Sequence, residues 1–476
     1  MSKNKNTHQQ DRKKRKYFGT DGFRGEANVD LTSFEAYKVG RFLGWYFSQS
    51  FAREKWITSK PKIVIGKDTR RSSYMIEYSI VAGITASGAD AYMLHVTTTP
   101  SVSFATRQDD FDCGIMVTAS HNPFCDNGIK IVNRYGEKLD DRVTSLIESY
   151  LDNDLSALGV TESDLPLATK EKIGSIIDYS SGRNRYVAYL ISLASHSYKD
   201  LKIGLDCANG SAWMIANALF TALGAKTYNI GVEPNGLNVN QDCGSTHVER
   251  LCDIVKKNHL DLAFAFDGDA DRCLAVDEQG NVVDGDKILF ILANRLKRLK
   301  TLKDDVVVST VASNSGLANS LEKIGVKNLQ TEVGDRFVYQ LMQEKGYLLG
   351  GEQSGHIIIK KYATTGDGLL TAIMLTEEVC DTKLSLNNLT KDFISFPQVL
   401  KNIKVKNKTL AVMDEEVLKV VKEIERKING DGKVLLRASG TEPVVRIMIE
   451  AKSQALCLEY ANKIETVIID RGFAND

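Results

Sequence analysis

A serine, a histidine and a lysine lie close together in one short segment of the sequence. Residues 114–123 are Gly-Ile-Met-Val-Thr-Ala-Ser-His-Asn-Pro, and Asn-Gly-Ile-Lys follows at 127–130. The first four residues form an apolar run typical of a buried strand, so Ser120 would stand at its end, beside His121 and Lys130. A hydroxyl in that setting is a candidate nucleophile with candidate bases. The alternative is a plain strand-ending turn, because Ser, Asn and Pro are ordinary turn residues.

Three aspartates occupy alternate positions of a second segment, Phe-Ala-Phe-Asp-Gly-Asp-Ala-Asp-Arg at 264–272. Asp267, Asp269 and Asp271 would project to one side of an extended loop and converge on one hard divalent cation such as Mg²⁺. Packing three like charges without a cation is costly. With Glu278 these carboxylates also match an EF-hand loop. We reject the EF-hand, because Arg272 stands where that loop needs glycine and residues 273–276 resemble a strand.

A third segment, Gly-Gly-Glu-Gln-Ser-Gly-His at 350–356, is rich in hydrogen-bonding groups. Glu352 and Ser354 are spaced to point the same way, which suits the recognition of sugar hydroxyls or an amine. His356 could relay a proton, although a lone histidine after a strand is more often structural.

A fourth segment, Arg-Ala-Ser-Gly-Thr-Glu-Pro at 437–443, is followed by Arg446. The two guanidinium groups, the hydroxyls of Ser439 and Thr441, and the backbone of Gly440 would cradle a phosphate dianion. The alternative is a turn that carries surface arginines.

A glycine-rich segment near the start, Gly-Thr-Asp-Gly-Phe-Arg-Gly at 19–25, contains Arg24. Its glycines would let backbone N–H groups and this guanidinium approach an anion closely. The pattern is a weak signal when taken alone.

Composition excludes several classes of protein. The chain has 476 residues, 43% of them hydrophobic and 26% charged, with a formal net charge of zero. No apolar run approaches the roughly 20 residues of a membrane span, and the polar N-terminus does not resemble a signal peptide. The eight cysteines are scattered without a C-x-x-C pair, so neither a disulfide framework nor a zinc site is indicated. We predict a soluble cytoplasmic protein with reduced thiols, with no membrane contact.

The serine, aspartate and Glu-Gln-Ser segments each follow a predicted strand, and these strands belong to a structural unit that occurs three times. Units of strand, polar loop and helix begin near residues 62, 201 and 305, and each has a second strand, at 114–120, 260–267 and 347–352. Apolar strands separated by helices predict parallel or mixed sheets covered on both faces. Sheets of this kind bind ligands at the carboxyl ends of their strands. The last part, with strands near 395–405, 434–436 and 444–449, has an α+β pattern.

The predicted fold is therefore three similar α/β domains followed by an α+β domain. We place the α/β domains at 17–168, 169–276 and 277–393, and the α+β domain at 394–476. Residues 1–16 end in the basic run Arg-Lys-Lys-Arg-Lys. We interpret this segment as a solvated, disordered tail rather than a nucleic-acid contact.

Together the segments describe one reaction. A serine at a strand end, a Mg²⁺ site, a polyol-binding loop and a separate phosphate cradle indicate phosphoryl transfer on a phosphorylated sugar. A second, non-reacting phosphate site makes little sense in a simple hydrolase. It does make sense if two phosphate positions are exchanged.

The motifs resemble those of the α-D-phosphohexomutase family over nearly the whole chain after the tail. T-A-S-H-N-P with N-G-x-K, D-G-D-A-D-R, G-E-Q-S-G-H and R-x-S-G-T-E-P occur in the family's order. Within the family the chain is most similar to the bacterial phosphoglucosamine mutases, through F-G-T-D-G-F-R-G, the alanine of D-G-D-A-D-R, the glutamine of G-E-Q-S-G-H and Y-A-T-T-G-D-G-L-L-T-A. Phe23 stands where that group usually has an aliphatic residue, and Ala438 where it often has proline. Neither departure removes a proposed catalytic group.

The resemblance implies a four-domain, heart-shaped enzyme with its site in a central cleft. Ser120 would be phosphorylated at rest and would donate its phosphoryl group to glucosamine 6-phosphate. The resulting glucosamine 1,6-bisphosphate, an intermediate and activator, would turn around and return its other phosphate to Ser120. Glucosamine 1-phosphate would then leave for amino-sugar nucleotide and cell-wall synthesis, from a monomer or homodimer. The alternative is a phosphoglucomutase or phosphomannomutase with the same mechanism.

The resemblance also implies a role for each motif. The ligands of one Mg²⁺ ion would be a phosphate and three carboxylates, on Ser120, Asp267, Asp269 and Asp271. Proton transfer would fall to Lys130, with His121 and His356 as the other candidates. The transferring group would be stabilised by Arg24 and Arg272, and the sugar would be bound by Glu352 and Ser354. The distal phosphate would be held by the fourth segment, through Arg437, Ser439, Gly440, Thr441 and Arg446.

Overall fold

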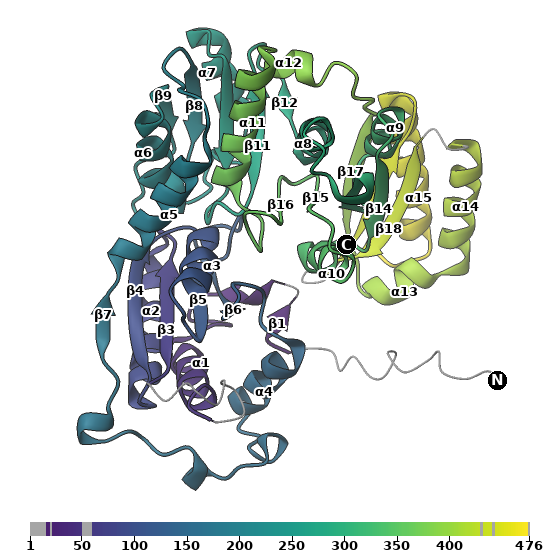
Figure 1. Ribbon diagram of the computed structural model, residues 1–476. Helices are drawn as coiled ribbons and strands as arrows, with labels where there is room; N and C mark the ends of the chain where they lie inside the picture. Colours follow the sequence, from purple (N-terminus) through teal and green to yellow (C-terminus); the bar gives the residue numbers. More distant parts are fainter. Residues whose placement is uncertain (1–15, 20, 50–59, 429–431, 440–442, 475–476) are drawn as a thin grey trace, which may run out of the picture.

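The computed structural model describes residues 16–19, 21–49, 60–428, 432–439 and 443–474. These residues form four β-sheets that follow one another along the chain. Figure 1 shows the first sheet below the second on one side of the molecule, with the third and fourth on the other side. All but the last residue of the predicted tail lie outside the described residues.

The first sheet carries the serine segment. Its strands are β1 (Phe18–Gly19), β2 (Gly22–Glu26), β3 (Lys62–Lys67), β4 (Asp90–Val96), β5 (Cys113–Val117), β6 (Asp126–Asn133) and β7 (Ile176–Asp178), in the order β1-β2-β6-β5-β3-β4-β7. β3 is parallel to β4 and β5, whereas β6 is antiparallel to β5 and β2. One face packs on α1 (Ser33–Tyr46), α2 (Arg71–Ala86) and α4 (Asp141–Leu151), and the other on α3 (Thr99–Gln108).

The second sheet carries the three aspartates. Its strands are β8 (Lys202–Asp206), β9 (Lys226–Ile230), β10 (Leu262–Phe266), β11 (Cys273–Asp277) and β12 (Val282–Val283), in the order β12-β11-β10-β8-β9. β8 is parallel to β9 and β10, and β10 turns back antiparallel into β11. The helices of this region are α5 (Ser180–Leu193), α6 (Ile215–Ala222) and α7 (Glu249–Asn258).

The third sheet presents the Glu-Gln-Ser segment. Its strands are β13 (Val306–Thr310), β14 (Lys327–Thr331), β15 (Leu349–Gly351) and β16 (Ile357–Ile359), in the order β14-β13-β15-β16. The accompanying helices are α8 (Gly285–Arg298), α9 (Ser315–Lys323), α10 (Asp335–Lys345), α11 (Gly368–Thr382) and α12 (Leu386–Leu389). α11 begins where Asp367 caps it, and residues of α8 and α11 share one core with the second sheet. The second and third sheets are therefore joined by a continuous apolar core.

The fourth sheet is smaller and antiparallel throughout. β17 (Gln398–Lys404), β18 (Lys433–Ala438) and β19 (Val444–Glu450) have the order β17-β19-β18. α13 (Lys408–Met413), α14 (Glu415–Ile428) and α15 (Gln454–Asp470) accompany them around a separate core. This arrangement agrees with the predicted α+β ending.

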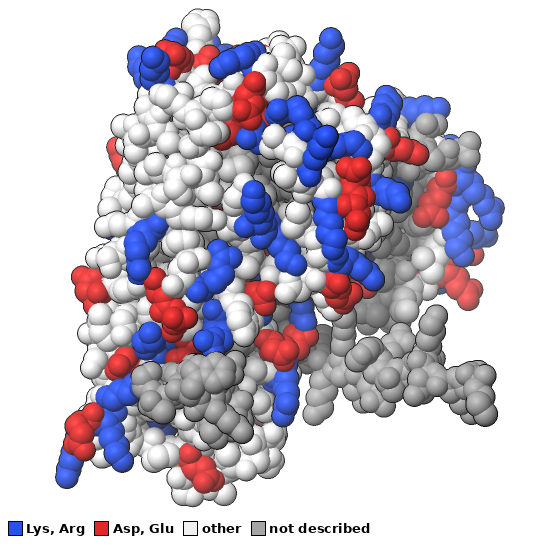
Figure 2. Space-filling model, viewed as in Figure 1, with Lys and Arg blue, Asp and Glu red and all other residues white. Residues whose placement is uncertain are grey.

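The predicted mixture of three α/β units and an α+β unit is confirmed. In each of the first three sheets a run of parallel strands reaches one edge, and antiparallel strands are added at the other edge. The predicted domain limits stay predictions, and β7, beyond the limit at 168, pairs with β4 of the first sheet. Among the described residues no helix combines the length and apolar character needed to cross a membrane. Figure 2 shows basic and acidic side chains interspersed on the visible face.

Candidate active site

Ser120 lies three residues beyond the end of the fully buried strand β5 and is itself 1% exposed. Its φ angle is +53°, a left-handed conformation that is uncommon for a residue other than glycine. The N–H of Ser120 donates to Thr118 Oγ1 at 3.0 Å, and its Oγ donates to Asp267 Oδ2 at 2.5 Å. His121 Nδ1 lies 3.5 Å from the same Oγ. The strand thus delivers the hydroxyl directly to the aspartate segment of the second sheet.

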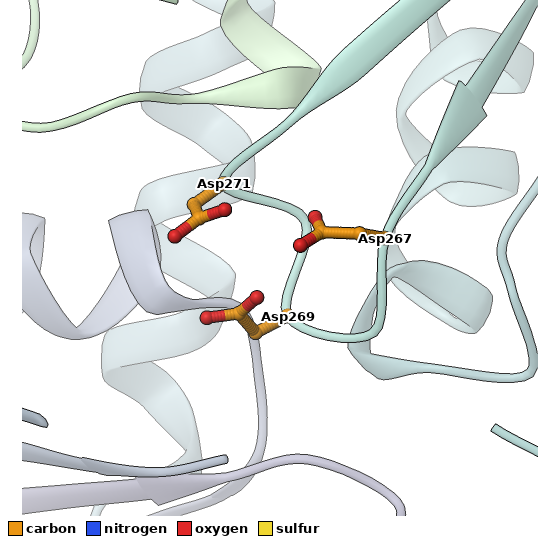
Figure 3. Close-up of side chains that lie close together, drawn as sticks. All are labelled: Asp267, Asp269 and Asp271. Atoms are coloured by element: carbon orange, nitrogen blue, oxygen red, sulfur yellow. The ribbon is translucent and has the colours of Figure 1, made fainter. Parts of the chain in front are cut away.

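The three aspartates lie in the tight turn between β10 and β11. Figure 3 shows their carboxylates turned toward a common space, and their candidate ligand atoms all lie within 4.8 Å of one another. All three side chains are buried. The turn continues into β11 rather than into a helix, which supports the rejection of the EF-hand.

The aspartate cluster fits a divalent cation. Asp269 Oδ1 and Asp271 Oδ1 are buried and have no hydrogen-bond partner among the described residues. Burial raises the pKa of Asp267 well above its usual value, and the charges of Asp271 and Asp269 add to this effect. Unpaired buried carboxylate oxygens are costly, whereas such oxygens are the ligands that Mg²⁺ prefers.

Lys130, on β6, reaches the same cluster. Its Nζ lies 2.8 Å from Asp269 Oδ2, 2.8 Å from Asp271 Oδ2 and 3.1 Å from Asp21 Oδ2. Burial alone would lower the pKa of this ammonium, but the charges of Asp21, Asp269 and Asp271 raise it well above the ordinary value. Lys130 is therefore a cation held among carboxylates.

Two guanidinium groups act on His121, the residue that follows Ser120. Arg24, on β2, forms an ion pair with Asp21, and the backbone N–H of Arg272 donates to Asp267 Oδ1 at 3.1 Å. The Nε atoms of Arg24 and Arg272 are buried without a hydrogen-bond partner among the described residues. Burial, and then these two cations, lower the pKa of His121 to about 3. Unused guanidinium donors beside a serine suit phosphoryl oxygens.

The third-sheet residues lie in the turn from β15 to β16. Glu352 Oε1 accepts a hydrogen bond from the N–H of Gly334 at 3.0 Å, and burial followed by the charge of Asp335 raises the pKa of Glu352. Ser354 Oγ is buried and without a partner among the described residues. The turn therefore presents one carboxylate and one uncommitted hydroxyl.

His356 connects this turn to the aspartate cluster. Its Nδ1 lies 3.7 Å from Asp271 Oδ1, and its Nε2 lies 3.5 Å from Asp335 Oδ2. Burial would lower the pKa of His356, but its interaction with the Asp271 carboxylate and the other neighbouring carboxylates raises it to about 9. The backbone N–H of Gly366 donates to His356 Nε2 at 3.1 Å. A nitrogen that accepts this hydrogen bond carries no proton of its own. The hydrogen bond from Gly366 therefore favours a neutral imidazole with its proton on Nδ1, whereas the surrounding carboxylates favour the imidazolium, which carries a proton on both nitrogens.

The fourth sheet contributes a pair of arginines. Arg437 on β18 and Arg446 on β19 face each other across the strand pair. Burial, followed by the charge of Arg446, lowers the pKa of Arg437, and the charge of Glu352 partly offsets this. Ser439 is buried beside them along the chain. Gly440 and Thr441, the rest of the predicted phosphate cradle, lie outside the described residues.

A cleft runs along the meeting point of the first three regions. It is lined by Asp21 and Lys130 of the first sheet, Asp271 of the aspartate turn, and Arg336 and Thr365 of the third region. Two predicted site residues from separate segments, Lys130 and Asp271, thus line one cleft.

Four family models match this chain in sequence. They are described as phosphoglucomutase/phosphomannomutase alpha/beta/alpha domains I, II and III, at residues 15–157, 184–280 and 284–396, and the C-terminal domain, at 400–467. The chain belongs to the phosphoglucomutase/phosphomannomutase family. It is accordingly an intramolecular phosphotransferase, as the motifs predicted.

Curated relatives of this phosphohexomutase match along almost its full length. The phosphoglucosamine mutase of Lachnospira eligens is 54% identical over 96% of this chain and 99% of its own. The phosphoglucosamine mutase of Bacillus subtilis is 46% identical, covering 95% and 98% of the two chains.

Solved structures share the fold of this phosphohexomutase. A phosphoglucomutase/phosphomannomutase family protein from Burkholderia thailandensis has a TM-score of 0.75 at 23% identity, covering 96% of this chain and 98% of its own. The Aspergillus fumigatus N-acetylphosphoglucosamine mutase, in complex with GlcNAc-6P and magnesium, has a TM-score of 0.67 at 17% identity and covers 96% of each chain.

The site of this phosphohexomutase also contains residues that the motifs did not single out for chemistry. Thr99 Oγ1, at the start of α3, donates to Asp269 Oδ2. Lys138 lies 3.0 Å from Asp21 Oδ1 and 2.6 Å from Asp335 Oδ2, which bridges the first and third regions. No local pattern distinguishes these side chains, because their partners Asp269 and Asp335 lie in other regions of the chain.

Proposed function

We propose that this phosphohexomutase interconverts glucosamine 6-phosphate and glucosamine 1-phosphate. The observation that carries the proposal is the hydrogen bond from Ser120 Oγ to Asp267, in a buried carboxylate cluster with unpaired guanidinium donors beside it. The names of the full-length relatives support the choice of glucosamine. The product would enter amino-sugar nucleotide and cell-wall synthesis in the cytoplasm.

The reaction would pass through two phosphoryl transfers. The phosphate on Ser120 moves to the O1 hydroxyl of glucosamine 6-phosphate, so that the bond from phosphorus to Ser120 Oγ breaks and a bond to O1 forms. The resulting glucosamine 1,6-bisphosphate turns around in the cleft. Its 6-phosphoryl group then moves to Ser120 Oγ, which restores the phosphoenzyme and leaves glucosamine 1-phosphate.

The residues around Ser120 would stabilise both transfers. One Mg²⁺ ion, held by the Ser120 phosphate and Asp267, Asp269 and Asp271, would neutralise charge on the phosphoryl group. The unused Nε donors of Arg24 and Arg272 would bind its oxygens.

Protons must move between the sugar hydroxyl and the serine oxygen. Lys130, His121 and His356 are the groups proposed for this transfer. His121 Nδ1 lies 3.5 Å from Ser120 Oγ, while Lys130 and His356 both contact Asp271. Each half-reaction needs one group to accept a proton and one to return it.

The recognition groups would hold the opposite end of the substrate. Glu352 and Ser354 would bind the sugar hydroxyls and the amine. The distal phosphate would be bound by the fourth-domain groups, Arg437, Ser439, Gly440, Thr441 and Arg446. Closure of the C-terminal domain would exclude water while the bisphosphate turns around.

The decisive experiment compares kcat/KM for glucosamine, glucose and mannose 6-phosphates in the presence of Mg²⁺. The protein should first be checked by mass spectrometry for Ser120 phosphorylation. We expect at least a tenfold preference for glucosamine 6-phosphate, about 1.4 kcal/mol in transition-state binding. A preference for glucose or mannose 6-phosphate would instead assign the chain to a sister mutase with the same mechanism. Phosphate release without isomerisation would contradict a mutase.

A further inference from the structure

The carbonyl oxygen of Ser120 accepts hydrogen bonds from two side chains outside its own loop. Arg70 Nη2 donates to it at 2.9 Å and Asn240 Nδ2 at 2.8 Å. The same two groups also donate to the carbonyl of Asn122, at 2.9 and 3.1 Å. Arg70 stands at the start of α2 in the first domain, whereas Asn240 lies between β9 and α7 of the second region. Donors from two domains therefore meet on the peptide of the nucleophile.

Arg70 is fully buried in a network built around this peptide. Its Nε donates to Asp68 Oδ2 at 2.7 Å, and its Nη1 donates to the carbonyl of Asp126 at 3.1 Å. Asp68 Oδ2 also accepts from Thr118 Oγ1 at 2.8 Å, and Thr118 Oγ1 accepts from the N–H of Ser120. A buried guanidinium is tolerated only when its donors are satisfied. One network thus holds both the N–H and the carbonyl of Ser120.

Asn240 and the aspartate turn between β10 and β11 lie against the same peptide. A Cβ added at Gly268, between Asp267 and Asp269, would lie 2.5 Å from the Ser120 carbonyl oxygen and 3.1 Å from Asn240 Nδ2. The turn can approach this closely only because residue 268 is glycine. Asn240 has φ +58°, a conformation that asparagine and aspartate adopt more readily than other side chains.

This network has a consequence for the direction of the Ser120 hydroxyl. The left-handed backbone of Ser120 is strained, and such a conformation persists only where the surroundings determine it. Rotation of the peptide toward an unstrained conformation would move Oγ away from Asp267 Oδ2, which lies 2.5 Å away. We propose that Arg70 and Asn240 are positioning residues that lock the Ser120 peptide and so aim its Oγ for phosphoryl transfer. The inference rests on the proposed function, in which Ser120 carries the phosphoryl group.

The test uses Asn240→Asp in the full-length protein. Aspartate keeps the shape and the tolerance for positive φ, but it replaces the N–H donor with an oxygen that repels the carbonyl. Thr69→Val is the matched control, because Thr69 Oγ1 donates to the carbonyl of Asn209 at 2.6 Å across the same domain boundary, without contacting Ser120. The readouts are the single-turnover rate of Ser120 phosphorylation by glucosamine 1,6-bisphosphate, the steady-state kcat and KM, and the Tm.

We expect Asn240→Asp to slow Ser120 phosphorylation and kcat by about 10- to 100-fold, because small misplacements of reacting groups have effects of this size. KM should stay within twofold of wild type. Ser120 of the Thr69→Val variant should be phosphorylated at the wild-type rate, whatever the Tm of that variant. Arg70→Lys, which keeps the charge but loses the planar fork, should slow phosphorylation at least as much as Asn240→Asp.

Three results would overturn the inference. In the first, Ser120 of the Asn240→Asp variant is phosphorylated at the wild-type rate. In the second, phosphorylation of the Thr69→Val variant is slowed equally, which would mean that any loss of contact across the domain boundary slows the reaction. If Asn240→Asp raises KM and leaves kcat unchanged, the residue acts in binding instead. A wild-type protein that takes no phosphoryl group on Ser120 would refute the proposed function itself. A wild-type protein that is phosphorylated, with an unaffected Asn240→Asp, would refute only the positioning role.

Discussion

The two halves of the site differ in how their charged groups are paired, although each half keeps unpartnered polar atoms among the described residues, such as Arg24 Nε and Asp269 Oδ1 in the first half. In the half formed by the first two sheets, the Ser120 hydroxyl donates a hydrogen bond to Asp267, and the Lys130 ammonium donates to Asp269 and Asp271. In the half formed by the last two sheets, Ser354 Oγ has no partner among the described residues, and Arg437 faces the like charge of Arg446. The groups proposed for phosphoryl transfer are therefore assembled across domains in the free protein. The groups proposed for recognition hold binding capacity for a ligand.

Removing the nucleophile should have the largest effect. Ser120→Ala should lower kcat at least about 10⁴-fold, because no other group can carry the phosphoryl intermediate. Steady-state assays and intact-mass analysis would measure the loss of activity and of the phosphoenzyme. Cys125→Ser, an exposed position in the same loop, should behave like wild type. Substantial turnover by Ser120→Ala would refute the assignment of the nucleophile.

Altering the carboxylate cluster should have the next largest effect. Asp269→Asn should lower kcat about 10³-fold, because metal stabilisation of the transferring charge is worth several kcal/mol. Activity as a function of Mg²⁺ concentration, with calorimetric Mg²⁺ binding, would measure this. Glu278→Gln is the control, since an EF-hand would need Glu278 as a ligand and the cluster does not. Equal losses in both variants would argue against the three-aspartate site.

A change in the recognition half should act mainly on binding. Arg437→Ala should raise KM for the sugar phosphate about 30-fold, or about 2 kcal/mol, through loss of charged hydrogen bonds. Its kcat should change less than its KM in the same assay. Arg426→Ala removes an exposed arginine of α14 in the same domain and should leave both constants unchanged. If Arg437→Ala leaves KM unchanged, the phosphate site lies elsewhere.

The smallest effect should come from the uncommitted hydroxyl. Ser354→Ala should raise KM about fivefold, because one neutral hydrogen bond contributes about 1 kcal/mol. Its Tm should not fall, since Ser354 Oγ has no hydrogen-bond partner to lose among the described residues. Ser101→Ala removes another buried hydroxyl that has no partner within the described part of the chain, and it should leave KM unchanged. A fall in Tm without a change in KM would give Ser354 a structural role.

Local patterns in the sequence were sufficient to predict the segments that carry the proposed chemistry. The apolar run before Ser120 forms the buried strand β5, and the alternating aspartates converge in the turn after β10. Both features arise within a few residues, where strand periodicity and turn geometry fix the direction of a side chain. The strand-like residues after Arg272 likewise form β11.

The sequence by itself therefore determined the elements, their order and the type of chemistry at the end of each strand. Only the tertiary structure decided which side chains support that chemistry. Thr99 and Asp269, 170 residues apart, meet through a side-chain hydrogen bond, and Asn240 lies 120 residues from the Ser120 carbonyl that it contacts. Arg70 is an ordinary residue at a helix start in the sequence, yet it is buried against the loop of the nucleophile. Such partners are set by how elements distant in the sequence pack against one another, and no local periodicity records that packing.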